Sequence, residues 1–218
     1  VILAFVLPLG WLARMALLRP ASDFDLLGSP LANSLLLAGL GTLVTLAVSV
    51  AIAAAARVSR AGRAALFAAS AGYAAPGAAI ALGALALFGA ARSMGLVGGL
   101  SAGLALTILV WTYASRFAAA GAQPIEAGLL RITPSHTGAA RLLGAGWMRR
   151  AVAIDLPMAG PSVAAAGLIV FVEILKELPA TLILRPFNFD TLAVVAYAYA
   201  SDERLAQSAA PALMVTAA

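Results

Sequence analysis

Residues 31–56 read LANSLLLAGLGTLVTLAVSVAIAAAA, an apolar run that contains no charged side chain. A helix rises 1.5 Å per residue, so a helix over this run is longer than the roughly 30 Å of hydrocarbon in a bilayer. The run therefore predicts a transmembrane helix, and it is the clearest such helix in the chain.

The rest of the chain has the same character. Of its 218 residues, 63% are hydrophobic and 11% are charged, whereas soluble domains usually carry about 25% charged residues. The mean hydropathy is +1.00. We expect an all-α, polytopic helical membrane protein with about six transmembrane helices, in which 1–218 form a single domain cut from a longer protein. The other apolar runs cover 1–18, 66–90, 100–121, 162–184 and 208–218.

The net charge of +5 does not indicate nucleic-acid binding, because the arginines fall between apolar runs and not along one polar face. Cytoplasmic loops of membrane proteins carry such an excess of arginine. If Arg57, Arg60 and Arg63 lie inside, Arg116 and the arginines of 122–160 lie inside too, since two crossings separate them. The segment 122–160 is therefore predicted to be a cytoplasmic loop of a multi-pass protein.

Several kinds of site are excluded by residue type. There is no cysteine and a single histidine, His136, so the usual Cys/His zinc sites are impossible. The only lysine, Lys176, is followed by Glu177, which excludes a phosphate-binding loop ending in Gly-Lys-Ser/Thr. No catalytic set is evident. We expect a protein that is no enzyme, holds no metal or cofactor, and depends on another subunit for energy.

The loop 122–160 is predicted to contain two short helices. Thr133 and Pro134 are typical of a helix start, with a hydroxyl cap before a proline at the first helical position. Gly144 and Gly146 then end that helix, and a second helix is expected over 147–155. The arginines lie beside small apolar residues, a composition that suits a helix bound in a partner's groove.

This loop resembles the EAA loop of binding-protein-dependent ABC permeases. Its stretch GAARLLGAGWMRRAVAIDLP is similar to the family pattern of E-A-A, three residues, G, nine residues and I-x-L-P. Gly138 stands where the family prefers glutamate. The matching residues, with Gly138, are Ala139, Ala140, Gly144, Ile154, Leu156 and Pro157.

The resemblance implies a mechanism and partners. In the family, this loop forms a coupling helix that docks into a cytoplasmic ATPase dimer, which binds the ATP and Mg²⁺. A periplasmic binding protein delivers the substrate, and a second permease half completes the pathway. The resemblance therefore implies a transport subunit in the bacterial inner membrane that works by alternating access.

A second resemblance concerns the substrate. The run KELPATLILRPFNFDTLA over 176–193 is similar to the C-terminal signature of ferric-iron permeases, and the chain resembles the second half of such a protein. The resemblance implies iron transport. Permeases for aminoethylphosphonate, thiamine or polyamines share much of the pattern, so these substrates remain alternatives.

Charged residues inside a predicted span are the other candidates. An unpaired charge at the bilayer centre costs about 2.5–3.5 kcal/mol on insertion scales. Glu173, Lys176 and Glu177 are spaced to share one helix face, where Lys176 would neutralise both acids, and Pro179 disrupts the helix. The four residues are predicted either to line the translocation path or gate, or to form a buried ion network that holds helices together.

Two other function classes remain open. An ion-coupled secondary transporter would use Glu173, Lys176 and Glu177 as its coupling site and need no ATPase. An intramembrane enzyme would need a catalytic pair within one span.

The two successive G-x-x-x-G spacings of Gly95, Gly99 and Gly103 are expected to support close helix packing.

Overall fold

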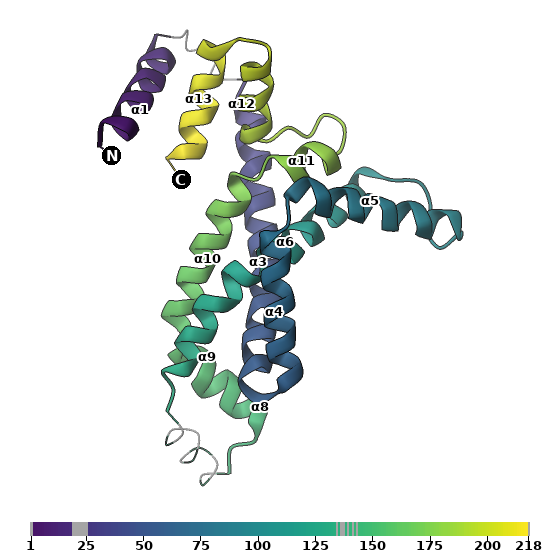
Figure 1. The fold of residues 1–218 in the computed structure, drawn as a ribbon, viewed down its shortest axis with the longest axis vertical. Coiled ribbons are helices and arrows are strands. Elements are labelled where there is room, and N and C mark those ends of the chain that lie inside the picture. The colour runs from purple at the N-terminus through teal and green to yellow at the C-terminus, as the bar shows by residue number, and fades with distance from the viewer. Residues whose placement is uncertain are drawn as a thin grey trace. The chain divides into compact units, whose positions relative to one another are not determined.

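The computed structural model describes residues 2–18, 26–133, 135, 138, 140, 142 and 144–217. Within these residues it contains helices and no strand, which confirms the predicted all-α class. The elements in chain order are α1 (Ile2–Leu17), α3 (Gly28–Val58), α4 (Arg60–Ala74), α5 (Gly77–Ser93), α6 (Ala102–Leu130), α8 (Trp147–Arg150), the π-helical turn η1 (Ala151–Asp155), α9 (Leu156–Met158), α10 (Gly160–Leu175), α11 (Pro179–Leu184), α12 (Leu192–Ser201) and α13 (Leu205–Thr216) (Figure 1).

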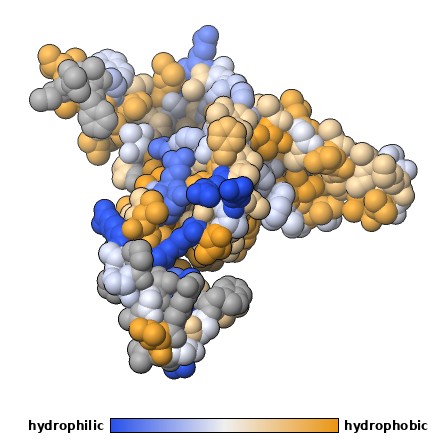
Figure 2. All heavy atoms as spheres, turned by 60° about the horizontal axis from the view of Figure 1, so that its bottom comes forward, coloured by the Kyte–Doolittle hydropathy of each residue, from blue (hydrophilic) through white to orange (hydrophobic). Residues whose placement is uncertain are grey.

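Two helices in the described part of the chain, α3 with 31 residues and α6 with 29, are long and apolar enough to cross a membrane. The number rises to four if α4 with α5, and Met148–Met158 with α10, each count as one bent span. The sequence predicted about six, and the remaining apolar helices are shorter, such as α12. The face of α5 that Figure 2 shows is mostly apolar, with a few weakly polar residues among the apolar ones, a composition that suits a lipid environment.

The contacts divide the chain into two compact units, each built from separate segments. The first contains 1–40, 77–110 and 172–218, and the second contains 41–76 and 111–171. In the first unit, α13 packs against both α1 and α12, and α11 packs against α5. Its buried cluster consists of Ala16, Leu27, Ala209 and Ala210.

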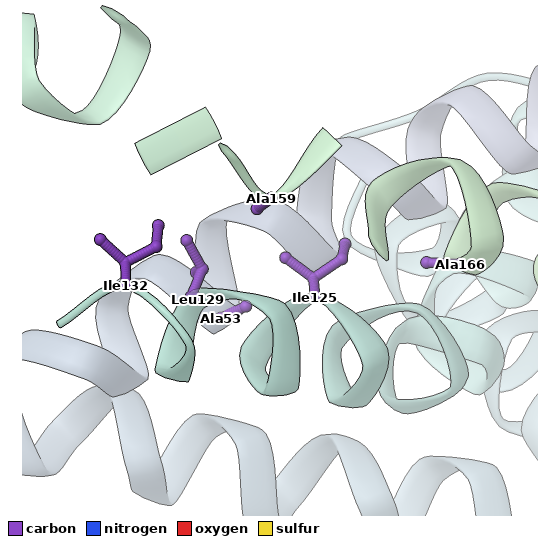
Figure 3. Packing of buried hydrophobic residues seen from close by; sticks show 6 residues of the cluster. All are labelled: Ala53, Ile125, Leu129, Ile132, Ala159 and Ala166. Atoms are coloured by element: carbon purple, nitrogen blue, oxygen red, sulfur yellow. The ribbon is translucent and has the colours of Figure 1, made fainter. Parts of the chain in front are cut away.

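The second unit has a core of small and branched apolar side chains. Ile125, Leu129 and Ile132 follow one another along and just after α6, and Ala159 lies opposite them (Figure 3). Ala53 of α3 belongs to the same buried cluster. Alanine at these contacts lets the helix backbones approach closely, which is how helices associate in a membrane.

The predicted loop 122–160 begins later than expected, because α6 continues to Leu130. Gln123, Pro124 and Glu126 give this stretch a polar composition, but Ile125 and Leu129 are buried in the core of the second unit. Packing of this apolar face keeps the stretch helical despite Pro124. As a consequence, Arg116 lies in the middle of α6 and not at the end of a span, and its guanidinium lies 5.3 Å from the Phe117 ring centroid.

Two predicted continuous spans are broken at prolines. In 66–90, α4 ends at Ala74 and α5 begins at Gly77. Ala75 has the extended ψ of 141° that the following proline favours in the residue before it. In 162–184, α10 ends at Leu175 and Pro179 begins α11, a position where the missing proline N–H costs no hydrogen bond.

Two other boundaries differ from the sequence prediction. The polar segment 185–207 contains the apolar helix α12, whose first turn is capped by Thr191 Oγ1 accepting from the Val194 N–H. The hydrophilic link 57–63 is reduced to Ser59, which caps α4 by accepting from the Gly62 N–H at 2.9 Å. Short polar stretches between helices therefore need not be loops.

The glycines at close helix contacts are not those expected. Gly95 and Gly99 lie in the turn before α6, and a Cβ added to Gly95, Gly99 or Gly103 meets no atom within 4 Å. In contrast, a Cβ at Gly121 would collide with the Ser49 side chain, and one at Gly128 with the Ser162 side chain. Within the described residues, these three glycines therefore do not make the close helix contacts that the G-x-x-x-G spacing predicted.

Candidate coupling site

The coupling segment, residues 138–157, contains a turn that requires glycine. Gly144 has a φ of +75°, a conformation that costs other residues about 1–2 kcal/mol. The Ala145 N–H donates to the Ala140 carbonyl at 3.0 Å, the bond that closes a Schellman turn after a helix end. The central glycine of the EAA-like pattern thus ends one helix and allows the chain to turn.

The predicted coupling residues differ in exposure. Ala140 is buried, Gly138 and Ile154 are half-buried, and Gly144, Leu156 and Pro157 are exposed. Ala139 and His136 lie outside the described residues, as does Pro134.

Several large apolar side chains of this segment are exposed. Leu142 is 91% exposed, Val152 60% and Met148 57%. They lie in the same stretch as Arg149, which is also exposed. Exposed apolar side chains beside an arginine are a composition found in protein-binding surfaces.

The second predicted helix, 147–155, is present but is not a regular α-helix. Its last five residues form the π-helical turn η1, in which the Leu156 N–H donates to the Ala151 carbonyl. Single π turns within α-helices are rare and often occur at functional sites. This turn ends at Asp155, which is 7% exposed.

Asp155 is the centre of an ion cluster with Arg57 and Arg150. Its Oδ2 accepts from Arg150 Nε at 3.2 Å, and its Oδ1 lies 3.4 Å from Arg57 Nη1. The second contact is an ion pair without hydrogen-bond geometry, and both of its atoms are shielded from solvent. Arg57 Nη2 also donates to the Ile132 carbonyl at 3.1 Å.

This Asp155 ion cluster was not predicted from the sequence, although Ile154, Leu156 and Pro157 on either side of Asp155 were. A signal was available. Asp155 is the only acidic residue between Glu126 and Glu173, in a stretch that contains four arginines. An isolated acid in a basic loop has arginines as its natural partners.

An apolar groove of about 480 Å³ borders the ion cluster within the second unit. Val50 and Ala54 of α3, Ile125 and Leu129 of α6, and Val152 of η1 line it, with Arg57, Arg150 and Asp155 at its polar edge. Apolar surroundings lower the local dielectric constant and strengthen the attraction between these charges.

The charged residues of the fifth predicted span surround the break between α10 and α11. Lys176 lies in a turn and is exposed, Glu173 is half-buried, and Glu177 is buried. Within the described residues Lys176 forms no ion pair with either acid, because α10 ends before it. Glu177 Oε1 instead accepts from the Ala180 N–H at 3.1 Å, so this carboxylate satisfies the first turn of α11.

The segment after α11 carries an exposed aromatic side chain. Phe187 is fully exposed, and an ion pair between Arg185 and Asp190 closes the loop around it. The Asn33 side-chain amide donates to the Asp190 carbonyl at 2.9 Å. Within the described residues, no group of three or more His, Cys, Asp and Glu side chains could hold a metal ion.

Comparisons with known proteins identify the fold. No protein-family model matches the chain, and no curated protein matches it in sequence. Its structure is similar to a chain in the crystal structure of a bacterial ABC transporter involved in the import of the acidic polysaccharide alginate. The TM-score is 0.81 at 17% sequence identity, and the match covers 98% of this chain and 85% of that chain. The chain therefore shares the fold of a component of a bacterial ABC transporter.

Proposed function

We propose that this chain is the membrane-embedded permease subunit of an ABC importer. The observation that carries this proposal is the likeness in fold, which extends over 98% of the chain, to a component of an alginate-importing ABC transporter. Helices long and apolar enough to cross a bilayer support it. The chain acts as a transport subunit in the bacterial inner membrane, and ATP and Mg²⁺ bind to its partner.

The coupling segment is the docking site for the ATPase dimer in this proposal. In the sequence, Gly138, Ala139 and Ala140 precede the turn at Gly144, and Ile154, Leu156 and Pro157 follow it. Exposed Leu142 and Met148 supply apolar contact area. On the opposite side of the membrane, a periplasmic binding protein delivers the substrate to this chain and to a second permease half.

The break between α10 and α11 is the proposed gate of the translocation path. Pro179 and Glu177 stabilise the break, because Pro179 begins α11 and the Glu177 carboxylate accepts a hydrogen bond from its first turn. Glu173 and the exposed Lys176 supply charge beside it. Ferric iron is the proposed substrate, supported by the resemblance of 176–193 to iron permeases.

Reconstitution tests the proposal. The chain is purified with the ATPase, the second half and the binding protein encoded in neighbouring reading frames, and placed in proteoliposomes with radioactive ferric iron. We expect uptake only when ATP, the ATPase and the binding protein are all present. Uptake driven by an ion gradient without the ATPase would contradict the permease role. ATP-dependent uptake of aminoethylphosphonate, thiamine or a polyamine in place of iron would overturn the substrate alone.

A further inference from the structure

We propose that Asp155 is a positioning residue that holds the coupling segment against α3, so that movement of the ATPase is passed to the membrane helices. This inference rests on the proposed permease function. It assigns a mechanical role to the Asp155 ion cluster, which none of the sequence patterns includes.

The cluster joins three separate parts of the second unit. Arg57 comes from the last turn of α3, Asp155 from the end of η1, and the Ile132 carbonyl from the chain just after α6. A single guanidinium therefore donates a hydrogen bond to the Ile132 carbonyl, just after α6, and forms an ion pair with Asp155, at the end of η1. Arginine suits this role because its planar group is always charged and presents several N–H donors.

The π-helical turn explains how Arg150 takes part. Residues five apart do not face each other on an α-helix, where neighbours are three or four apart. In η1 the hydrogen bonds run between residues five apart, which brings Arg150 and Asp155 to the same side. The irregular turn is thus the feature that lets one carboxylate contact two arginines.

The surroundings largely shield the cluster from solvent. The side chains of Arg57, Arg150 and Asp155 are 20%, 13% and 10% exposed, and the groove beside them is apolar. Removing the carboxylate would leave two partly buried guanidinium groups without their counter-charge. They would repel each other, and the coupling segment would lose its attachment to α3.

The test replaces Asp155 in the complete transporter. Asp155→Asn keeps the shape and removes the charge, Asp155→Glu keeps the charge, and Asp202→Asn is a matched control because Asp202 is exposed. A spin label on Val152→Cys, in η1, reports the local motion. We expect Asp155→Asn to raise the mobility of the spin label and to lower uptake at least tenfold. In the variant transporter, the ATPase should hydrolyse ATP at a rate that the binding protein no longer stimulates. Asp155→Glu should recover part of the coupling, and Asp202→Asn should match the unmodified protein.

The outcomes separate the two proposals. If the unmodified complex shows no ATP-dependent transport, the permease function itself fails. If it transports and Asp155→Asn has unchanged mobility and coupling, the role of Asp155 is overturned. If Asp155→Asn does not assemble, Arg57→Gln decides the question, because glutamine can still donate to the Ile132 carbonyl and lacks the charge that pairs with Asp155. Full coupling in an assembled Arg57→Gln transporter would overturn the inference, and uncoupling would support it.

Discussion

Gly144 and Gly146 stand two residues apart in the coupling segment, but only Gly144 has a positive φ. Neither glycine has an atom within 4 Å of the position that a Cβ would take. Any difference between their alanine variants therefore comes from the backbone and not from a collision of side chains.

We expect Gly144→Ala to destabilise the turn by about 1 kcal/mol, because alanine is strained at the positive φ of this position. The hydrogen bond from the Ala145 N–H to the Ala140 carbonyl should weaken in the variant, and so should binding of the ATPase. Gly146→Ala should have little effect on either. Hydrogen exchange of the Ala145 amide and co-purification of the ATPase measure the two quantities. Equal exchange rates in the two variants would contradict this role of Gly144.

Glu177 allows a separate test, because its carboxylate accepts a hydrogen bond that glutamine can also accept. Glu177→Ala should lower the stability of the protein in detergent by about 1 kcal/mol, the usual cost of losing a helix cap. Glu177→Gln should retain it. Thermal denaturation of the two variants checks this difference.

Uptake by Glu177→Gln then separates the two hypotheses for the residue. Retained stability with lost uptake would assign the charge to the translocation path, whereas retention of both would assign Glu177 to helix packing. Equal stability of the Ala and Gln variants would show that the bond to Ala180 contributes nothing.

At this scale the sequence predicted residue types better than their partners. The pattern identified Gly144, whose conformation matches the need for glycine. It missed Asp155, because an isolated acid among four arginines indicates a basic partner but not which one: the contact to Arg150 depends on a π-helical turn, and Arg57 is distant in the sequence. Lys176 was expected to neutralise Glu173 and Glu177 on one helix face. Because α10 ends at Leu175, the three side chains do not share such a face.

Among the helices, close contact depends on glycines whose added Cβ would meet another segment. Gly121 of α6 faces Ser49 of α3, whose hydroxyl donates to the Ala118 carbonyl at 3.0 Å. Gly89 of α5 has nothing within 4 Å. The two positions therefore form a matched pair of helical glycines, one crowded and one open.

We expect Gly121→Ala to destabilise the protein by about 1–3 kcal/mol, the usual cost of overpacking a well-packed contact. Gly89→Ala should be neutral or stabilising by about 0.5–1 kcal/mol, since alanine favours the helix. The midpoints of thermal unfolding in detergent measure both changes. A loss of stability in Gly89→Ala as large as that in Gly121→Ala would contradict the assignment.

Helix existence could be predicted from hydropathy, but helix ends could not. The stretch 122–130 looks like a loop because it contains Gln123, Pro124 and Glu126, yet packing of Ile125 and Leu129 keeps it helical. In 66–90 the opposite occurs, since the apolar composition continues through Pro76 while the helix does not. Tertiary contacts determine where α6 ends, and proline geometry determines where α4 ends. The mean hydropathy of a sequence window carries information on neither.

For the molecule as a whole, composition alone predicted a helical membrane protein, because a chain with 11% charged residues has too little polar surface for water. The sequence motifs indicated a transporter subunit, and the fold is that of an ABC transporter component. The grouping of contacts into two units could not be predicted from hydropathy. Three helices, α3, α6 and α10, contribute residues to both units, so the division does not follow the apolar runs.

The chain has no cysteine, so a single introduced cysteine reports on one position. Leu142, in the coupling segment, and Phe187, after α11, are both almost fully exposed. Because 122–160 is expected inside and the predicted crossing 162–184 separates it from Phe187, the proposed topology puts the two residues on opposite sides of the membrane. In intact spheroplasts, a membrane-impermeant maleimide should label Phe187→Cys and should label Leu142→Cys only after permeabilisation. The reverse pattern would overturn the topology.

The most direct test of the central claim is a crosslink between the coupling segment and the ATPase. Leu142→Cys and Phe187→Cys are each loaded with a photoactivated crosslinker in the assembled, ATP-hydrolysing complex, and the products are identified by mass spectrometry. We predict an adduct with the ATPase from Leu142→Cys and none from Phe187→Cys. Absence of the Leu142 adduct in an active complex, or an ATPase adduct from Phe187, would contradict the account.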